Sequence, residues 1–164
     1  MNWLRHIAMY LVTLLITVGA ASCSGEDCPI NNTVMGKMVF YNQYQDAVYF
    51  DGTLTVSVVR PQGDSVVVNQ KYGPSDVLFP LSYMHNTDTL IFCYSGGGGV
   101  TYDSLYISHT NTPTLVSVDC GTAMFHSITS VGSTHHMIDT LILKSSEVNY
   151  DERENIQVIY RTAN

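Results

Sequence analysis

Residues 53–58 are Thr53-Leu54-Thr55-Val56-Ser57-Val58, in which polar and apolar side chains alternate without a break. Successive side chains of a strand point to opposite faces of its sheet, so this segment predicts a strand with one buried and one solvated face. The alternation returns in 116–120, where it would turn Cys120 toward the core, and in 156–160. Because no stretch keeps an apolar period of 3.6 residues, the chain is predicted to be all-β.

The composition of the chain also favours strands. After Cys23 there are 16 Val and 14 Thr but three Ala, a bias toward strands over helices. Turn-forming residues separate the alternating segments at 60–64, 73–76 and 111–113. Short strands at this spacing indicate an antiparallel β-sandwich, with an immunoglobulin-like Greek key as the favoured arrangement. The predicted strands are 38–44, 47–50, 53–60, 65–70, 77–81, 88–94, 101–108, 114–120, 123–131, 136–144 and 156–162.

The length and the charge limit the possible architectures and functions. With 164 residues, of which 45% are apolar, the chain is predicted to form one folded domain. We expect a signal peptide at 1–22, a lipidated tether and N-terminal segment at 23–36, and the β-sandwich at 37–164. The formal net charge is −7, opposite in sign to a surface that binds a phosphate backbone, so no nucleic-acid partner is expected.

The N-terminus has the pattern of an export signal. Arg5 precedes an almost unbroken apolar run over 7–19, which is typical of a signal peptide and short for a membrane span. The run leads into Ala20-Ala21-Ser22-Cys23, which resembles a bacterial lipobox with Ala20 in the usual place of leucine. Acylation of Cys23 by chains such as palmitate would anchor the mature protein to a membrane. Ordinary signal cleavage, which leaves Cys23 as a thiol or half-cystine, is the alternative.

The residues after the lipobox bear on the membrane face at which the protein resides. Glu26 and Asp27 form an acidic pair that resembles the export signal of Bacteroidota lipoproteins sent to the cell surface. The alternative is a solvated tether in the periplasm. We therefore expect an outer-membrane lipoprotein on either the periplasmic or the surface-exposed face.

Four cysteines indicate an oxidising compartment. If Cys23 is acylated, the simplest arrangement of the other three cysteines is one disulfide and one free thiol. We favour a bond between Cys28 and Cys120, which would pin the N-terminal segment to a strand. Cys93 lies in the apolar segment 90–94, where a thiol would pack as a small buried hydrophobe. No Cys-x-x-Cys pair is present, which disfavours a zinc knuckle or a thioredoxin-like centre.

A short acidic pattern recurs along the chain. Asp followed by Ser or Thr and then Leu or Val occurs at 64–66, 88–90, 103–105 and 139–141. The favoured interpretation is structural, with Asp accepting a backbone hydrogen bond at a strand start and the hydroxyl residue entering the strand. The pattern also resembles the O-glycosylation acceptor of exported Bacteroidota proteins. In that interpretation the acceptors are Ser65, Thr89, Ser104 and Thr140.

The candidates for a metal site are histidines, whose imidazole groups are common ligands. His135 and His136 are adjacent, but neighbours in a strand point to opposite faces, so both cannot easily bind one ion. His126 shares a strand face with Met124 and Ile128, which favours a hydrogen-bonded core histidine. We therefore expect no metal and no cofactor, with His126, His135 and His136 as weak candidates.

Common catalytic and phosphate-binding motifs do not occur. The run Gly96–Gly99 lacks a following Lys-Ser/Thr and a helix, so it predicts a hairpin turn between 88–94 and 101–108. Neither Gly-x-Ser-x-Gly nor His-Glu-x-x-His is found. Aromatic residues in 40–50 could stack on sugar rings, although packing in the core is the favoured interpretation. These residues are Phe40, Tyr41, Tyr44, Tyr49 and Phe50.

Several further segments of the mature chain are distinctive. They are Asp27-Cys28-Pro29-Ile30-Asn31-Asn32-Thr33-Val34, Leu81-Ser82-Tyr83 ahead of Asp88-Thr89-Leu90, Ser117-Val118-Asp119-Cys120-Gly121 and Asn149-Tyr150-Asp151. Together they resemble a family of small Bacteroidota lipoproteins of unknown function, over nearly the whole mature chain. The resemblance implies that Cys28 and Cys120 are paired family positions and that Cys93 is a departure. It implies no activity, because that family has none assigned.

The expected function is binding rather than catalysis. The sequence favours a lipid-anchored, all-β envelope protein that acts as a binding or accessory module. Its expected partners are the membrane, through the lipid anchor, and an unidentified protein or glycan. Two alternatives stay open, namely a small metal-assisted envelope enzyme around His126, His135 and His136, and a glycan-binding accessory protein.

Overall fold

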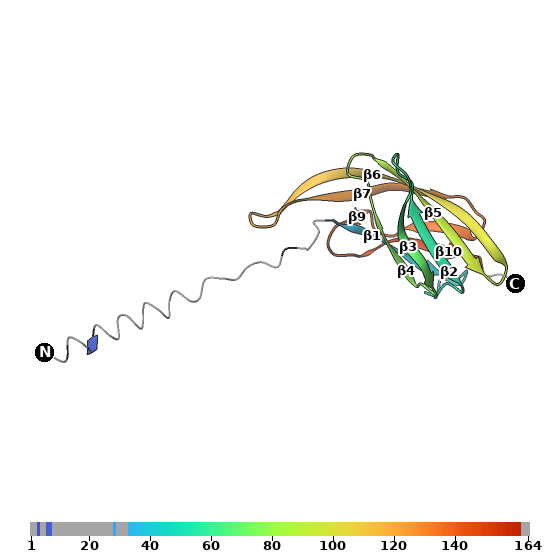
Figure 1. Cartoon of the computed structure of the whole chain (residues 1–164), viewed down its shortest axis with the longest axis horizontal. Coiled ribbons are helices and arrows are strands. Elements are labelled where there is room, and N and C mark those ends of the chain that lie inside the picture. The colour runs from blue at the N-terminus through green and yellow to red at the C-terminus, as the bar shows by residue number, and fades with distance from the viewer. Residues whose placement is uncertain (1–2, 4–5, 8–27, 29–32, 162–164) are drawn as a thin grey trace.

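The computed structural model describes Trp3, residues 6–7, Cys28 and residues 33–161. The expected lipidation site, Cys23, and most of the expected signal peptide lie outside the described residues. Within 33–161 the chain forms ten strands and no helix, in two sheets (Figure 1). The all-β prediction is therefore confirmed. Among the described residues, no helix has the length and apolar character needed to cross a membrane.

The first sheet contains both the first and the last strand. Its order is β4-β1-β10-β8. β1 and β10 are parallel neighbours, with Val39 opposite Gln157, so this sheet is mixed and not purely antiparallel as predicted. The other pairs of the sheet are antiparallel. The strand bounds are β1 Met35–Tyr41, β4 Asp76–Pro80, β8 Ile138–Leu143 and β10 Glu154–Tyr160.

The second sheet has six strands in the order β3-β2-β5-β6-β7-β9, and all its pairs are antiparallel. The sandwich is confirmed, but β1 and β2 lie in different sheets, whereas the first two strands of an immunoglobulin domain share one. The strand order is therefore not that of the expected immunoglobulin-like fold. The bounds are β2 Thr53–Val58, β3 Ser65–Tyr72, β5 Thr87–Gly96, β6 Gly99–Ser117, β7 Gly121–Ser133 and β9 Glu147–Val148.

The core lies between the sheets and is built from alternate side chains of the strands. In β2, Leu54, Val56 and Val58 are buried, as the alternation of 53–58 predicts. Met38 and Phe40 of β1 are buried from the opposite sheet. Removal of apolar surface from water contributes roughly 25 cal/mol per Å², so these inward faces are the main source of the stability of the sandwich.

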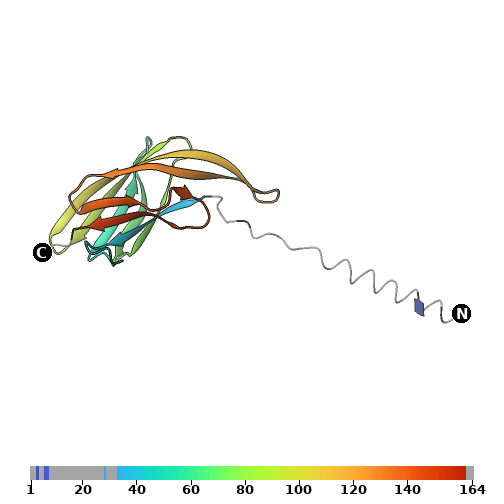
Figure 2. The ribbon, with the colours of Figure 1, turned by 180° about the vertical axis from the view of Figure 1, so that it is seen from behind.

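β6 and β7 extend beyond their neighbours and form a long two-stranded arm. β5 pairs with β6 only as far as Ser108, and His109 N donates to the Asn86 carbonyl oxygen at 2.8 Å, so one edge of β6 has no strand partner from Thr110 onward. Pro113, predicted to lie in a turn, pairs with Met124 inside the ladder. An open edge tolerates proline because the missing N–H is not needed there. The predicted strands 101–108 and 114–120 are thus one strand, and we call residues 109–127 the arm (Figures 1 and 2).

A disulfide joins Cys28 to Cys120, with the two Cα atoms 5.3 Å apart. The favoured pairing is confirmed. Cys120 does not point into the core from a strand, because β6 ends at Ser117 and residues 118–120 form the turn at the tip of the arm. Thr33 also forms a parallel bridge with Met124 of β7. The N-terminal segment is therefore fastened to the arm at two places.

Two further predicted boundaries differ from the structure. Residues 47–50 form no strand and contribute one isolated bridge, between Tyr41 and Ala47. β9, a pair of residues opposite His126 and Ser127, was not predicted. Gly96–Gly99 does form the predicted hairpin turn between β5 and β6.

Candidate functional site

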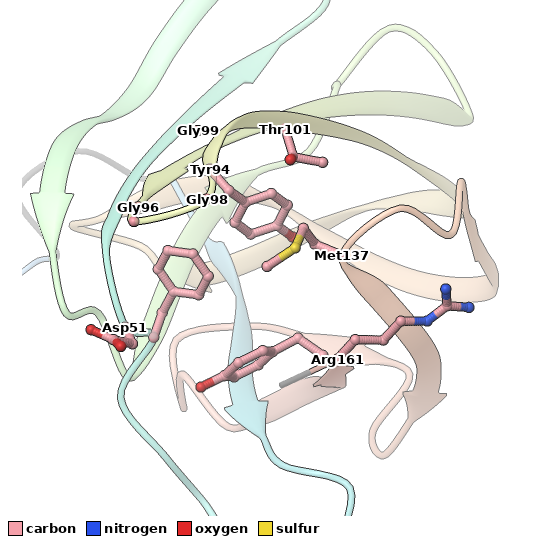
Figure 3. Close-up of a pocket in the computed structure, with 11 residues that line it drawn as sticks. Asp51, Tyr94, Gly96, Gly98, Gly99, Thr101, Met137 and Arg161 are labelled. Atoms are coloured by element: carbon pink, nitrogen blue, oxygen red, sulfur yellow. The ribbon is translucent and has the colours of Figure 1, made fainter. Parts of the chain in front are cut away.

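A cleft of about 510 Å³ opens between the two sheets at the end where β5 turns into β6. One wall is the end of β5 and the glycine turn, and the other comes from the end of β10 and the residue before β8. The connection from β1 to β2 closes a third side. The lining residues are Phe50, Asp51, Tyr94, Gly96, Gly97, Gly98, Gly99, Thr101, Met137, Tyr160 and Arg161 (Figure 3).

Aromatic rings form the interior surface of this cleft. The ring of Phe50 lies 5.1 Å from that of Tyr94 and 5.7 Å from that of Tyr160, measured between centroids, and both contacts are inclined. Such geometry is favourable for aromatic pairs. Figure 3 shows Tyr94 and Met137 pointing toward each other across the cleft. The Tyr160 hydroxyl donates to the Tyr49 carbonyl oxygen at 3.2 Å, which holds its ring in place.

Glycines shape the cleft in two ways. Gly52 has φ of 139°, and a Cβ there would lie 2.6 Å from the Ser95 carbonyl oxygen, so only glycine lets this backbone approach the end of β5. At Gly97 and Gly98 an added Cβ would meet no atom within 4 Å. Because the turn carries no side chains there, the mouth of the cleft is left open.

Charged groups stand at the rim, on opposite sides. Asp51 lies on one side in Figure 3, and the Arg161 side chain extends away on the other. Arg161 Nε donates to Asp139 Oδ1 at 3.5 Å, and both side chains are about half exposed. Burial, followed by the negative charge of Asp103, raises the pKa of Tyr94, so its hydroxyl stays protonated at physiological pH. The cleft thus offers apolar walls and a polar rim, which suits a small amphipathic ligand.

A second group of polar side chains is buried near the opposite end of β5. Asp88 Oδ2 accepts from Ser82 N at 2.7 Å and from His109 Nε2 at 3.0 Å, while its Oδ1 accepts from Arg60 Nη1. The side chains of Asp88 and His109 are 1% and 0% exposed. Burial of a carboxylate is costly unless it is paired and hydrogen-bonded. The Asp88 carboxylate has three such partners, namely Arg60, Ser82 and His109.

Asn111 determines where the protons of two histidines lie. Its amide nitrogen donates to two backbone carbonyls of the 83–85 loop, each at 3.1 Å, so its Oδ1 must accept from the imidazoles. The Nδ1 atoms of His109 and His126 lie 2.9 and 2.7 Å from that oxygen, and both therefore carry protons. The Nε2 atom of His109 lies 3.0 Å from Asp88 Oδ2, so both of its ring nitrogens are within hydrogen-bond distance of an oxygen atom.

His126 is neutral at physiological pH. Burial and then the positive charge of His109 lower the pKa of His126 to about 4, against the opposing effect of Asp88. Its Nε2 is buried and has no hydrogen-bond partner among the described residues. The Tyr83 ring stacks on it with centroids 5.8 Å apart. His126 is thus a core histidine, as its strand position predicted.

The hydrogen bonds of this cluster hold the loop 81–86 against the second sheet. The side chains of Asp88 and His109 are enclosed within the cluster. On the loop, Ser82 Oγ accepts from Met84 N and His85 N at 3.3 and 3.1 Å. The hydroxyl therefore stabilises the turn of the loop.

The three histidines named as weak metal candidates do not share a site. His126 belongs to the buried cluster, and His135 is exposed in the connection from β7 to β8. His136 lies in the same connection, with Nδ1 3.3 Å from Asp103 Oδ1 and its side chain 65% exposed. Within the described part of the chain, no group of three or more His, Cys, Asp or Glu is placed to hold a metal ion.

The recurring acidic tripeptides fall into two environments. Asp88 and Asp103 are buried and accept hydrogen bonds from backbone N–H groups of loops, whereas Asp64 and Asp139 are exposed. Asp103 lies inside β6 and not at a strand start as predicted. The hydroxyl residues differ in the same way. Ser65 and Thr140 are exposed, and Thr89 and Ser104 are half-buried.

Other candidate residues also have definite places. Cys93 is half-buried on the outer face of β5, opposite Tyr102, and not in the core as predicted. Phe40 and Phe50 are buried, whereas Tyr44 and Tyr49 are 86% and 74% exposed. Of the aromatic residues considered for sugar stacking, only Phe50 lines the cleft.

The sequence carries no local signal for the cleft, because its walls come from separate segments that meet only after folding. The glycine turn was the nearest indication, since a run without side chains leaves space beside it. The buried cluster has a partial signal in the position of His126. Two other members of the cluster, Asp88 and Asn111, are 38 and 15 residues from His126 along the chain.

The comparisons with known proteins give one match. The model of a family of unknown function (DUF6452) matches residues 53–160. Neither the curated proteins nor the solved structures contain a match to the chain. The matched range holds β2 to β10 and the whole buried cluster. It also holds most of the cleft lining, but Phe50, Asp51 and Arg161 lie outside it.

Proposed function

Since the chain belongs to a family of unknown function (DUF6452), we propose a role from its own residues: it is a lipid-anchored envelope protein that binds a small amphipathic ligand in the end cleft, without catalysis. The observation that carries the binding role is the cleft itself. Phe50, Tyr94 and Tyr160 give it an aromatic interior, and the polar groups at its mouth could orient a ligand.

The anchor rests on the sequence. The apolar run over 7–19 and Ala20-Ala21-Ser22-Cys23 support export and acylation of Cys23. A protein with several acyl chains stays on a membrane, because each buried methylene contributes about 0.8 kcal/mol. The disulfide between Cys28 and Cys120 agrees with an oxidising compartment, which supports an envelope location, on the periplasmic or surface face of the outer membrane.

Binding is favoured over catalysis by the chemistry of the lining. Aromatic rings, a thioether and glycine backbone make apolar contacts, whereas acid–base or nucleophilic chemistry requires a reactive pair within hydrogen-bond reach of a substrate. The Asp88–His109 pair is enclosed by the loop 81–86. A stoichiometric transition metal in the purified protein would instead favour the metal-assisted enzyme.

The binding role is tested by ligand-observed NMR with a panel of indole, naphthoate and methyl glycosides. We expect saturation transfer from the protein to the aromatic probes. Gly97→Trp places a large side chain at the mouth of the cleft and should abolish the transfer. Gly132→Trp is the matched control, since Gly132 also has no atom within 4 Å of an added Cβ and lies outside the cleft. Equal transfer from both variants would contradict binding in the cleft.

The anchor is tested separately. Radiolabelled palmitate should be incorporated into the wild-type chain and not into Cys23→Ala, and only the wild type should partition into the detergent phase. Lack of label, or detergent partitioning of Cys23→Ala equal to that of the wild type, would contradict the proposed anchor.

A further inference from the structure

The tip of the arm exposes apolar side chains. Val118, in the turn, is 92% exposed, and Leu115, near the end of β6, is 65% exposed. The arm has no Lys or Arg, and Asp119 is its one acidic residue. The tip is thus a small, weakly charged apolar surface that projects beyond the rest of the sandwich (Figures 1 and 2).

The disulfide places this surface close to the proposed anchor. Cys28 is five residues from Cys23 along the chain, a span of at most about 18 Å. Because the Cα atoms of Cys28 and Cys120 are 5.3 Å apart, the tip of the arm can move no farther than about 23 Å from the acylated residue. The opposite end of β6 begins at Gly99 in the cleft, and a strand of 19 residues covers about 60 Å along its path.

We propose that the tip of the arm rests on the membrane, with Leu115 and Val118 at the bilayer interface. This inference rests on the proposed lipid anchor. The short tether brings the tip to the bilayer surface, and transfer of exposed apolar side chains from water into the interface is favourable. The occupant is therefore the lipid surface itself. The cleft, at the other end of β6, faces away from the membrane.

A tryptophan substitution reports this contact directly. Trp3 is the only tryptophan of the chain and lies in the segment expected to be removed, so a new tryptophan is the sole one in the mature protein. Val118→Trp puts the reporter at the tip. Tyr44→Trp is the matched control, because Tyr44 is 86% exposed in the connection between β1 and β2, which borders the cleft.

The experiment uses the full chain, acylated in bacteria and reconstituted into phosphatidylcholine vesicles with and without brominated acyl chains. In Val118→Trp we expect brominated lipid to quench the tryptophan and vesicles to shift its emission to shorter wavelength, with neither effect in Tyr44→Trp. Replacing both Cys28 and Cys120 by Ser in the Val118→Trp chain should reduce the quenching while the protein still floats with the vesicles. Circular dichroism checks that this variant is folded.

The possible failures are distinguishable. If the acylated protein floats with vesicles but the tryptophan is quenched no more in Val118→Trp than in Tyr44→Trp, the tip does not contact lipid and the inference is wrong while the anchor stands. If the emission of Val118→Trp is already shifted without lipid and the protein is dimeric, the tip packs against a second copy, which also overturns the inference. If the chain does not float at all, the proposed anchor itself fails.

Discussion

Asp103→Asn should destabilise the sandwich strongly, because the carboxylate of Asp103 holds the connection from β7 to β8. Its Oδ1 accepts from Thr134 Oγ1 at 2.7 Å and from His136 N at 2.9 Å, and its Oδ2 accepts from Met137 N at 2.7 Å and Ile138 N at 3.1 Å. The Asp103 side chain is 0% exposed. An amide replaces one acceptor oxygen by an NH₂ group, so backbone N–H donors then face another donor in either orientation.

The magnitude follows from the number of donors left without an acceptor. Each buried donor without a partner costs about 1–3 kcal/mol, and Asp103→Asn leaves one or two of them. The expected loss in free energy of unfolding is therefore about 1–6 kcal/mol. Asp139→Asn is the matched control, because it alters the Asp of the same tripeptide pattern at an exposed site. There the contact of Asp139 with Arg161 is worth about 0–1 kcal/mol.

The assay is urea unfolding followed by circular dichroism, with comparison of midpoints at constant slope. Burial alone would raise the pKa of Asp103, but hydrogen bonds from His136, Met137, Thr134 and Ile138 outweigh it and lower the pKa below 3.8. The contribution of Asp103 is therefore present above about pH 4 and lost as the pH falls through the lowered value. A loss below about 1 kcal/mol at neutral pH, or equal losses for the two variants, would refute the reasoning.

Two further predictions concern the histidine cluster and the hydroxyl acceptors. The pKa of His126 is lowered from 6.5 to about 4, so the unfolded chain binds more protons between these values, and unfolding free energy should fall by at most about 3 kcal/mol from pH 6.5 to 4. His126→Phe should reduce the pH dependence of the unfolding free energy between pH 6.5 and 4. An unchanged pH dependence would contradict the lowered pKa of His126. If the native protein is O-glycosylated, its intact mass should exceed polypeptide plus lipid and decrease in Ser65→Ala and Thr140→Ala, since these two acceptors are exposed. A mass explained by polypeptide and lipid alone would exclude the modification.

The fold was predictable where local pattern and burial agree. The alternation of 53–58 predicts β2 and its buried face, because one face of that strand meets the core and the other meets solvent. The turn predicted at 111–113 was wrong, because the open edge of β6 makes proline compatible with a strand there. That edge is open only because β5 ends early. The sequence near Pro113 does not indicate this tertiary arrangement.

The candidate site was less predictable, because identical local patterns serve different purposes. Asp103-Ser104-Leu105 and Asp139-Thr140-Leu141 have the same pattern, yet one carboxylate is buried under a loop and the other is exposed. The position of His126 on the same strand face as Met124 and Ile128 correctly predicted that it is buried. That position does not identify its hydrogen-bond partner. That partner, Asn111, comes from the neighbouring strand through the β6–β7 register.

The disulfide connects the two proposals, because it determines how freely an anchored sandwich can turn. Without it, the first described chain contact after Cys23 is the bridge of Thr33 with Met124, ten residues away, a tether of up to about 35 Å. With it, the tether shortens to five residues, or at most about 18 Å, and it ends at Cys28, which is bonded to the tip of the arm. The tether is much shorter than the path of about 60 Å along β6, which favours an orientation in which the cleft end lies away from the point of anchorage. If the anchor is present, the disulfide therefore shortens the tether and holds the tip of the arm, the end opposite the cleft, near the point of anchorage.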